Sequence, residues 1–519
     1  MDKFRPCSIY LLLSLLLVST AFSPSLVESG EKDNVKLAVK DAIKIALEKN
    51  LSLKFGSLEP EIKKTDIEIG EAAFDPKVLG GVYGQKDRRP FASAFAKPDI
   101  GDNLEEEWRI GLAQKLKLGT EYDFTLRSKM KDTNSLYAGL DPEYGSEVSL
   151  NFTQPLLREF GTDINSTNIL VAKNNKNISD LQFKQMMIDV ATNAQNAYWD
   201  LVYARENLKV QVESLNLAKD FERRIEAQVK VGTMAPIEIL QAKAEVAARD
   251  EDIILAKNNL EKASDALKEI MNLGDDLYNW GGLIDPIDQP SFIVEKTELD
   301  KKISAAMEKR PDMLELKKTL ENENIHVKYN ENKLYPSLDL VGSLGLNGMS
   351  GTAKAVGFGA DVSQSRFGGG YGKDFDRMFS GDFYSWKVGV NVEYPLGNRL
   401  AKNELSASKL RVQKLLFQLK DIEKKIALEV RSGVRDMETN IQRVESTRVS
   451  RKLAEEKLDA EEKKFEAGLS TSFNVLSYQK DLTTQETAEI KAIIDYNRSI
   501  VGLQKTVAET LDVNGIQLQ

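Results

Sequence analysis

Residues 386–396 have the sequence WKVGVNVEYPL, and this stretch decides the fold class. From Trp386 to Tyr394 every second residue is apolar, and those between are polar or glycine. Such alternation predicts a β-strand with one apolar face and one polar face. The Pro395-Leu396 pair ends the run, and the following sequence predicts a long helix over about 400–467. Gly468 then separates this helix from another that ends near residue 511, so long antiparallel helices are joined to strands.

The same order of elements occurs earlier in the chain. There a strand-rich region ends at Gln154-Pro155-Leu156, residues 163–230 contain neither proline nor glycine, and Gly232 follows. After the two glycines the halves align without a gap, with matches Ile239 to Val475, Leu240 to Leu476, Glu245 to Asp481 and Leu267 to Leu503. A repeat of this size predicts two copies of one structural unit, packed side by side.

The predicted fold class is mixed and mainly α, with internal duplication. We expect four segments along the chain. They are a signal peptide over 1–21; a first repeat over 35–273, with N-terminal helices, strands in 77–155 and a long helix pair in 163–271; a connection over 274–296; and a second repeat over 297–512, with helices in 297–333, strands in 335–395 and a helix pair in 400–511.

The N-terminus has the features of a secretory signal peptide. Lys3 and Arg5 precede an apolar run over 9–18, and small residues follow at 19–21. A single-pass anchor is the alternative, but the run is short for a bilayer. Cys7 is the only cysteine, so the mature chain would hold no disulfide or thiolate site. No later segment resembles a transmembrane helix, so a membrane span would have to use strands.

Alternating strands with aromatic residues near their ends, such as Trp386 and Tyr394, are typical of a membrane β-barrel with a wet lumen. A soluble sandwich with one solvated face has the same alternation. However, the strands are too few to bury a core of their own. Six candidate strands cannot close a wide barrel alone, so an oligomer would have to share it.

The long helices carry a coiled-coil-like stripe, in which spacings of four and three predominate from Val190 to Leu215. A helix over 163–230 would be roughly 100 Å long. Inward positions are often alanine, as at 194, 197, 204 and 218, which permits the close packing of a hollow cylinder of helices. An ordinary antiparallel coiled coil is the alternative.

Catalytic, cofactor-binding and metal-binding motifs are absent from the sequence. The net charge of −9 argues against a nucleic-acid partner. The single histidine, His326, lies on a polar helix where we expect it to be solvated. Gly368-Gly369-Gly370 lacks the strand-to-helix context of a phosphate loop and is expected to be a mobile extracellular loop.

The order of these pieces resembles the TolC-like outer-membrane efflux proteins over nearly the whole mature chain. The matching pieces are Ala42 to Asn50, Phe74-Asp75-Pro76, Gln154-Pro155-Leu156-Leu157, Arg310-Pro311-Asp312, Trp386 through Leu396, and the two glycine turns. The resemblance implies a homotrimeric passive duct rather than an enzyme, with no cofactor. An outer-membrane β-barrel, in contact with lipid, would continue as an α-helical barrel across the periplasm. A periplasmic adaptor and an inner-membrane transporter would deliver the substrates of an efflux or type I secretion system.

Two other classes of protein fit the sequence less well than the duct. A structural or adhesive surface protein with a coiled-coil stalk would need no second strand segment in mid-chain. A periplasmic adaptor would need a lipoyl-like domain, which the sequence lacks. One departure from the family is that its members often have two strands per half, whereas the first half here offers four. The extra hairpin, 108–128, could widen the barrel or lie outside it.

The resemblance also implies two sets of site residues near the glycine turns. The adaptor-docking helix tips are expected at Val231, Gly232, Thr233, Gly468, Leu469 and Ser470. The candidate periplasmic gate residues are Glu238, Gln241, Asn474 and Ser477. In the family, acidic residues can lie six and nine positions beyond the second glycine, but Asn474 and Ser477 are neutral here. We therefore expect a closed state held by helix packing and hydrogen bonds, with weak block by cations.

Overall fold

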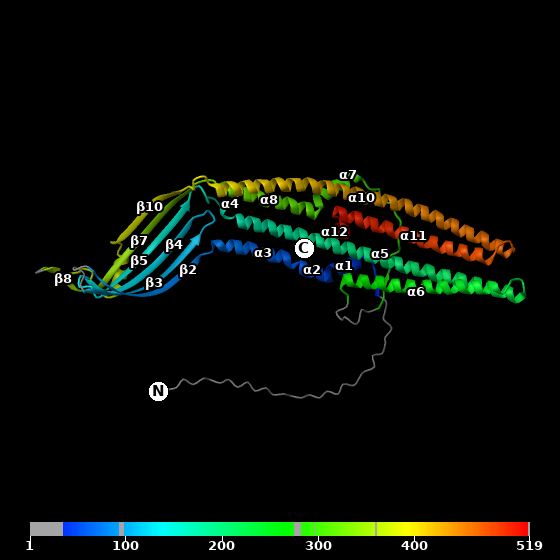
Figure 1. The fold of residues 1–519 in the computed structure, drawn as a ribbon, viewed down its shortest axis with the longest axis horizontal. Helices are drawn as coiled ribbons and strands as arrows, with labels where there is room; N and C mark the ends of the chain where they lie inside the picture. The colour runs from blue at the N-terminus through cyan, green and yellow to red at the C-terminus, as the bar shows by residue number, and fades with distance from the viewer. Residues whose placement is uncertain (1–34, 93–97, 274–281, 295, 359–360, 517–519) are drawn as a thin grey trace, which may run out of the picture.

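The computed structural model describes residues 35–92, 98–273, 282–294, 296–358 and 361–516, and the expected signal peptide lies outside them. The molecule is elongated, with a β-sheet at one end and long helices running away from it (Figure 1). The helix hairpins turn back at the end that lies farthest from the sheet.

The sheet has six antiparallel strands in the order β10-β7-β5-β4-β3-β2. The first half of the chain supplies β2 to β5, and the second half supplies β7 and β10. The expected extra hairpin corresponds to β3 and β4, which pair with β2 and β5 and so lie inside the sheet. The bounds are β2 Lys77–Pro90, β3 Ile100–Lys115, β4 Glu121–Thr133, β5 Leu140–Pro155, β7 Ser337–Ala353 and β10 Tyr384–Glu393.

The strands are longer than the apolar alternation predicts. The polar stretches 87–105 and 131–145 interrupt this alternation, but much of each continues a strand. Glu105 pairs with Lys131 across β3 and β4, and Arg88 pairs with Asp102 across β2 and β3. Backbone pairing does not depend on side-chain polarity, and opposite charges on facing strands favour it.

The glycine-rich region 348–382 is also largely structured. β7 continues to Ala353, and β8 Ala355–Phe358 and β9 Asp361–Gln364 form a small hairpin. A short helix, α9 Gly372–Phe379, then packs against β7 and β5. Gly368-Gly369-Gly370 lie outside the named helices and strands, as expected of a loop, and are tied to β7, since Gly368 pairs with Gly351 and Gly369 donates to the Gly351 carbonyl at 2.8 Å.

Two helix hairpins make up the length of the molecule. The 65-residue α5 pairs with α6, and the 68-residue α10 pairs with α11. The predicted start of the first long helix, residue 163, falls in a separate short helix, α4, because the helix is interrupted at Ser166. Shorter helices lie alongside α5 and α10. The bounds are α1 Val39–Lys49, α2 Leu51–Gly56, α3 Leu58–Glu71, α4 Thr162–Asn165, α5 Thr167–Val231, α6 Ile237–Met271, α7 Leu299–Lys309, α8 Pro311–Asn332, α10 Arg399–Glu466, α11 Ser472–Val507 and α12 Thr510–Val513.

Alanine is frequent on the buried face of α5, as predicted. The alanines at 194, 197, 204 and 218 are all buried. Val212, however, is exposed, whereas Val210 and Ser214 are buried. A straight helix has 3.6 residues per turn, whereas the predicted apolar stripe assumes an average spacing of 3.5 residues. The stripe therefore drifts around the helix surface along its length. The buried face has therefore moved by the time the helix reaches this position.

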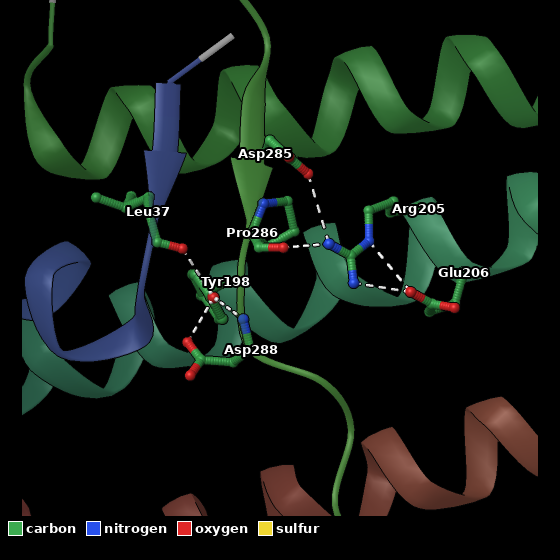
Figure 2. A network of polar contacts seen from close by, with 7 residues as sticks. All are labelled: Leu37, Tyr198, Arg205, Glu206, Asp285, Pro286 and Asp288. Carbon is green, nitrogen blue, oxygen red and sulfur yellow. Dashed lines mark hydrogen bonds and ion pairs between the residues drawn. The ribbon is translucent and has the colours of Figure 1, made fainter.

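A polar network ties the start of the described chain to the middle of α5. β1 Val35–Leu37 and β6 Ile284–Pro286 form a parallel pair beside α5 (Figure 2). The Tyr198 hydroxyl lies 2.6 Å from Asp288 Oδ2 and 3.0 Å from the Leu37 carbonyl oxygen. Two turns along the same face of α5, Arg205 donates to the Pro286 carbonyl. The described part of the connection expected over 274–296 is thus hydrogen-bonded to α5.

Burial of this network affects the chemistry of its tyrosine. Burial, and then the hydrogen bond to Asp288, raise the pKa of the Tyr198 hydroxyl well above its ordinary value. The hydroxyl therefore keeps its proton and remains a donor at physiological pH. The backbone N–H of Val39 donates to the same Asp288 oxygen at 2.8 Å, so one carboxylate joins helix α1 to helix α5.

Candidate functional site: a two-faced sheet and two helix tips

One face of the sheet is apolar and largely uncovered. The register of the six strands brings the apolar members of each alternation onto a common face. Val82 on β2 is 85% exposed and Val388 on β10 is 66% exposed. Other large side chains on this face are Val78, Ile110, Leu112, Phe124, Leu150, Leu344, Trp386, Val390 and Val392, all of which are exposed. A soluble protein rarely leaves a patch of this kind uncovered.

The opposite face of the same sheet is charged and polar. Arg127 on β4 lies 3.9 Å from Glu107 on β3 and 3.6 Å from Glu147 on β5, measured between nitrogen and oxygen. Arg109 donates to the Tyr83 hydroxyl at 2.6 Å. These are exposed or half-exposed pairs, so water screens them and their contribution to stability is small. They mark a face suited to water rather than to lipid.

The edges of the sheet are the strands β2 and β10. Among the described residues, neither strand has a backbone partner on its outer side. The strands alternate in direction, and the sheet has an even number of them. β2 and β10 therefore run in opposite directions, and β2 of one copy could pair with β10 of another in the same antiparallel sense. Unpaired edges of this length are sites of association in proteins.

The two helix tips have the same backbone structure. Gly232 has a φ of +85° and Gly468 has a φ of +74°, the left-handed region that glycine adopts most readily. Thr233 N–H donates to the Gln228 carbonyl at 3.0 Å, and Leu469 N–H donates to the Lys464 carbonyl at 2.9 Å. This is the Schellman arrangement that commonly ends helices. The expectation that these glycines end the long helices is confirmed.

Apolar side chains project into solvent around the tips. Val231 is 79% exposed and Leu469 is 80% exposed. Thr233 and Gly468 are exposed, while Ser470 is half-buried and donates to Glu461. Ile237, Leu240 and Phe473 are also exposed near the turns. Just inside the tips, the rings of Phe221 and Phe465 lie 5.2 Å apart, so the two hairpins end side by side.

The candidate gate residues do not form one cluster. Glu238 is half-buried, and its carboxylate accepts a hydrogen bond from Ser472 at the start of α11. Gln241 is half-buried, whereas Asn474 and Ser477 are exposed. The Asn474 side chain donates to Ser470 at 3.3 Å. Glu238 is thus neither an exposed outer-face carboxylate nor a free one, because it joins the two hairpins of a single protomer.

A buried arginine links the hairpins farther from the tips. Arg249 on α6 is buried and pairs with Glu245 one turn away, with a nitrogen–oxygen distance of 2.8 Å. Its guanidinium also donates to Ser214 on α5 and, at 3.3 Å, to Thr483 on α11. Sequence reasoning missed this residue. The available signal was a single arginine in the alanine-rich stretch of residues 242–249, where an inward-facing position needs polar partners.

Metal sites and membrane-spanning helices are two further features to consider in the described part of the chain. The described residues contain no cluster of three or more His, Cys, Asp or Glu side chains placed to hold a metal ion. His326 on α8 is half-buried rather than fully solvated. In the same part of the chain, every helix is too short or too polar to cross a membrane.

Known proteins share both the sequence pattern and the fold. The family model described as outer membrane efflux protein matches residues 43–273 and 302–509. No curated protein matches the chain.

Three solved structures illustrate the similarity of fold. The Campylobacter jejuni CmeC outer membrane channel has 16% sequence identity and a TM-score of 0.62, covering 96% of this chain and 94% of that one. The open state of the Neisseria gonorrhoeae MtrE outer membrane channel has 17% identity and a TM-score of 0.60, covering 91% and 89%. A membrane protein from Pseudomonas aeruginosa has 16% identity and a TM-score of 0.63, covering 90% and 92%. At these identities the similarity concerns the fold.

Proposed function

Because the chain belongs to the outer membrane efflux protein family, we propose that it is the passive export duct of a tripartite efflux or type I secretion system. A channel of this family is not an enzyme. In the proposed system, substrates leave an inner-membrane transporter, pass a periplasmic adaptor and enter the duct between the helix tips. They leave the cell through the sheet end, which lies in the outer membrane.

The observation that carries this proposal is a sheet with a bare apolar face and two unpaired edges. Lipid would cover the apolar face, but it cannot satisfy unpaired backbone groups, so the edges must pair. Pairing of β2 with β10 of the next copy, repeated around a threefold axis, satisfies both edges. Three copies would contribute about eighteen strands, a number that encloses a water-filled channel in known barrels.

The height of the apolar face is consistent with a membrane. β10 carries apolar side chains from Tyr384 to Val392, and Tyr394 follows at the end nearer the helices. Ten residues of strand extend roughly 33 Å, and a tilt of about 40° reduces this to roughly 25 Å. Aromatic residues at both ends and apolar residues between them match the girdles of outer-membrane strands.

The long helices would form the periplasmic part of the duct. At 65 and 68 residues, α5 and α10 each extend roughly 100 Å. Their buried alanines permit the close spacing that a wall of parallel helices requires. The two halves of the chain contribute equivalent helix hairpins, which supports the proposed internal duplication. Neighbouring copies would complete the cylinder around a hollow interior.

The helix tips are the proposed adaptor-docking surface. Val231, Gly232, Thr233, Gly468, Leu469 and Ser470 lie at the end of the molecule farthest from the sheet (Figure 1). Exposed valine and leucine at the extreme ends of two hairpins would lose contact with water on docking, which favours association. The gate, in this proposal, lies just inside the tips at Glu238, Gln241, Asn474 and Ser477.

Chemical labelling of intact cells tests the proposed orientation. A cysteine replacing Thr133, at the end of the sheet far from the helices, should react with a membrane-impermeant maleimide from outside. A cysteine replacing Leu118, in the turn beside the helices, should not. Leu118 is preferable to Gly119, whose φ is +99° and where a Cβ would lie 2.6 Å from the Glu159 carbonyl oxygen. The adhesive-stalk alternative makes the reverse prediction, with labelling at Leu118 and at the tip residue Leu469.

A further inference from the structure

The short helix α9 lies across the apolar face of the sheet, at the end far from the long helices. Tyr371, just before it, hydrogen-bonds to Trp108 on β3 at 2.8 Å and to Ser128 on β4 at 3.1 Å. Its ring also contacts Tyr144 on β5, with centroids 5.3 Å apart. Trp108, Ser128 and Tyr144 belong to the apolar alternation of their strands. The segment 365–379 therefore covers the face that the proposed function assigns to lipid.

The sheet is shaped to receive this helix. Under α9 the apolar alternation changes to small residues, namely Ser146 on β5 and Gly348 and Ser350 on β7. Both serines are buried, and a Cβ at Gly348 would lie only 1.9 Å from the Asp374 carbonyl oxygen. Larger side chains here would lift the helix off the strands. The contact is thus built into the sheet and is not a chance position of a loop.

The segment is fastened by hydrogen bonds as well as by packing. Arg377 donates to the carbonyls of Met349 at 2.8 Å, Phe367 at 2.7 Å and Gly368 at 3.0 Å. Ser350 donates to the Gly370 carbonyl at 3.0 Å. The guanidinium therefore holds the helix to β7 and to the chain that precedes it.

The two long edges of α9 differ in character. Arg377 donates to the carbonyls of Phe367 and Gly368. Gly368 pairs with Gly351, which lies nearer the far end of β7 than Gly348 does. The Arg377 edge of α9 therefore faces the far end of the sheet. In a helix, residues two positions from Arg377 point about 160° away from it. Phe375 and Phe379 therefore occupy the edge that faces the apolar band. Phe375 stacks on Trp108, whereas Phe379 is 68% exposed.

We propose that residues 365–379 are an interfacial element that binds lipid of the outer leaflet. Phe379 inserts among acyl chains at the top of the apolar band. Arg366 and Lys373, both exposed, lie level with the anionic head groups, and Lys373 also pairs with Asp376 at 3.4 Å. Two observations select lipid as the partner. The helix is continuous with the bare apolar face, and its aromatic and basic edges are arranged as at a membrane interface. This inference rests on the proposed function.

Depth-dependent quenching tests the inference in proteoliposomes. The mature chain is expected to lack cysteine, so a single cysteine replacing Phe379 can carry a fluorescent probe. We expect lipids with a doxyl group high on the acyl chain to quench this probe more strongly than lipids with the group near the chain end. A probe at Lys373→Cys should be quenched by aqueous iodide instead. Quenching of the Phe379→Cys probe by iodide, with none by doxyl lipids, would overturn the inference.

Two control positions separate this inference from the proposed function. A probe at Val390→Cys, in the middle of the apolar band, should be quenched most strongly by doxyl groups near the chain end. A probe at Leu136→Cys, in the loop after β4, should respond only to iodide. Absence of lipid quenching at Val390→Cys would refute the membrane placement of the sheet. Lipid quenching at Val390→Cys but not at Phe379→Cys would refute the interfacial role of α9 alone.

Discussion

The side chain of Ser472, the first residue of α11, donates a hydrogen bond to the carboxylate of Glu238 in the first turn of α6. The two residues come from different hairpins, separated by 234 positions in the sequence. The contact lies close to both tips, so the tips cannot separate without breaking it. It also occupies the one carboxylate among the four candidate gate residues.

This contact predicts a closed state that depends on hydrogen bonding between the hairpins. Ser472→Ala should raise the resting single-channel conductance in planar bilayers, because the tips lose one of their connections. Thr484→Ala, which removes an exposed hydroxyl farther along α11, should leave the conductance unchanged. Divalent cations should block the wild-type channel only weakly, since Asn474 and Ser477 are neutral. Strong block that survives Glu238→Gln would contradict this view of the gate.

The exposed tips predict a second effect, on export. Gly468→Trp should abolish export while trimer assembly is preserved, since a bulky side chain at the turn would obstruct docking. Nothing lies within 4 Å of a Cβ at Gly468, so the folded hairpin has room for the substitution. The left-handed φ adds about 1 kcal/mol of local strain.

Leu469→Ser provides a version of this test without backbone strain. It removes an exposed apolar side chain and should also weaken export, whereas Leu136→Ser at the opposite end of the molecule should not. A photo-crosslinking residue at position 469 should capture a periplasmic protein. Normal export with both tips altered would remove them from the docking surface.

The buried Arg249 predicts a loss of stability when it is neutralised. Arg249→Met removes hydrogen bonds from a charged group to Glu245, Ser214 and Thr483, and should lower the free energy of unfolding by about 1.5–3 kcal/mol. Arg443→Met is the matched control, because Arg443 pairs with Asp495 at 3.0 Å on the surface, and such pairs contribute at most about 1 kcal/mol. Thermal unfolding in detergent compares the two. Equal effects would show that the buried network has no special role.

Glu486 on α11 predicts a pH dependence. Burial, and then the nearby charge of Glu213, raise the pKa of the Glu486 carboxyl, so the fold disfavours its ionised form. A raised folded-state pKa means that this group opposes folding most at pH values above it. The opposition declines as the pH falls below the folded-state pKa and disappears below the lower pKa of the unfolded chain. Glu486→Gln should therefore raise the melting temperature at neutral pH.

The difference between the two proteins should shrink as the pH is lowered, because the wild-type carboxyl then becomes neutral as well. Glu445→Gln, on α10, is a control for removal of a charge from these helices. A Glu486→Gln variant that is less stable than wild type at neutral pH would show that the ionised carboxylate is favoured in the fold.

The broad architecture could be predicted because it depends on local patterns. Alternation from Trp386 to Tyr394 specifies a strand, and stretches without proline specify the long helices. Gly232 and Gly468 specify their ends, because few other residues adopt a left-handed backbone without strain. The strand ends could not be predicted, since charged residues such as Glu105 and Lys131 pair across the sheet as readily as apolar ones.

The contacts between distant segments could not be predicted. The three partners of Arg249 lie on three helices, and only the folded arrangement brings them together. The packing of α9 depends on Gly348 and Ser146, whose small size has no evident meaning in the sequence alone. The pairing of Ser472 with Glu238 depends on how the two hairpins lie against each other, and no local sequence pattern specifies this.

The measurement that tests the central claim most directly is the mass of the purified protein in detergent, corrected for bound detergent. Closure of the sheet through β2 and β10 of neighbouring copies predicts a single species with three times the mass of one chain. Removal of detergent should cause aggregation, because the apolar face, including Val82 and Val388, is then left in water. A stable monomer that remains soluble without detergent would contradict the account.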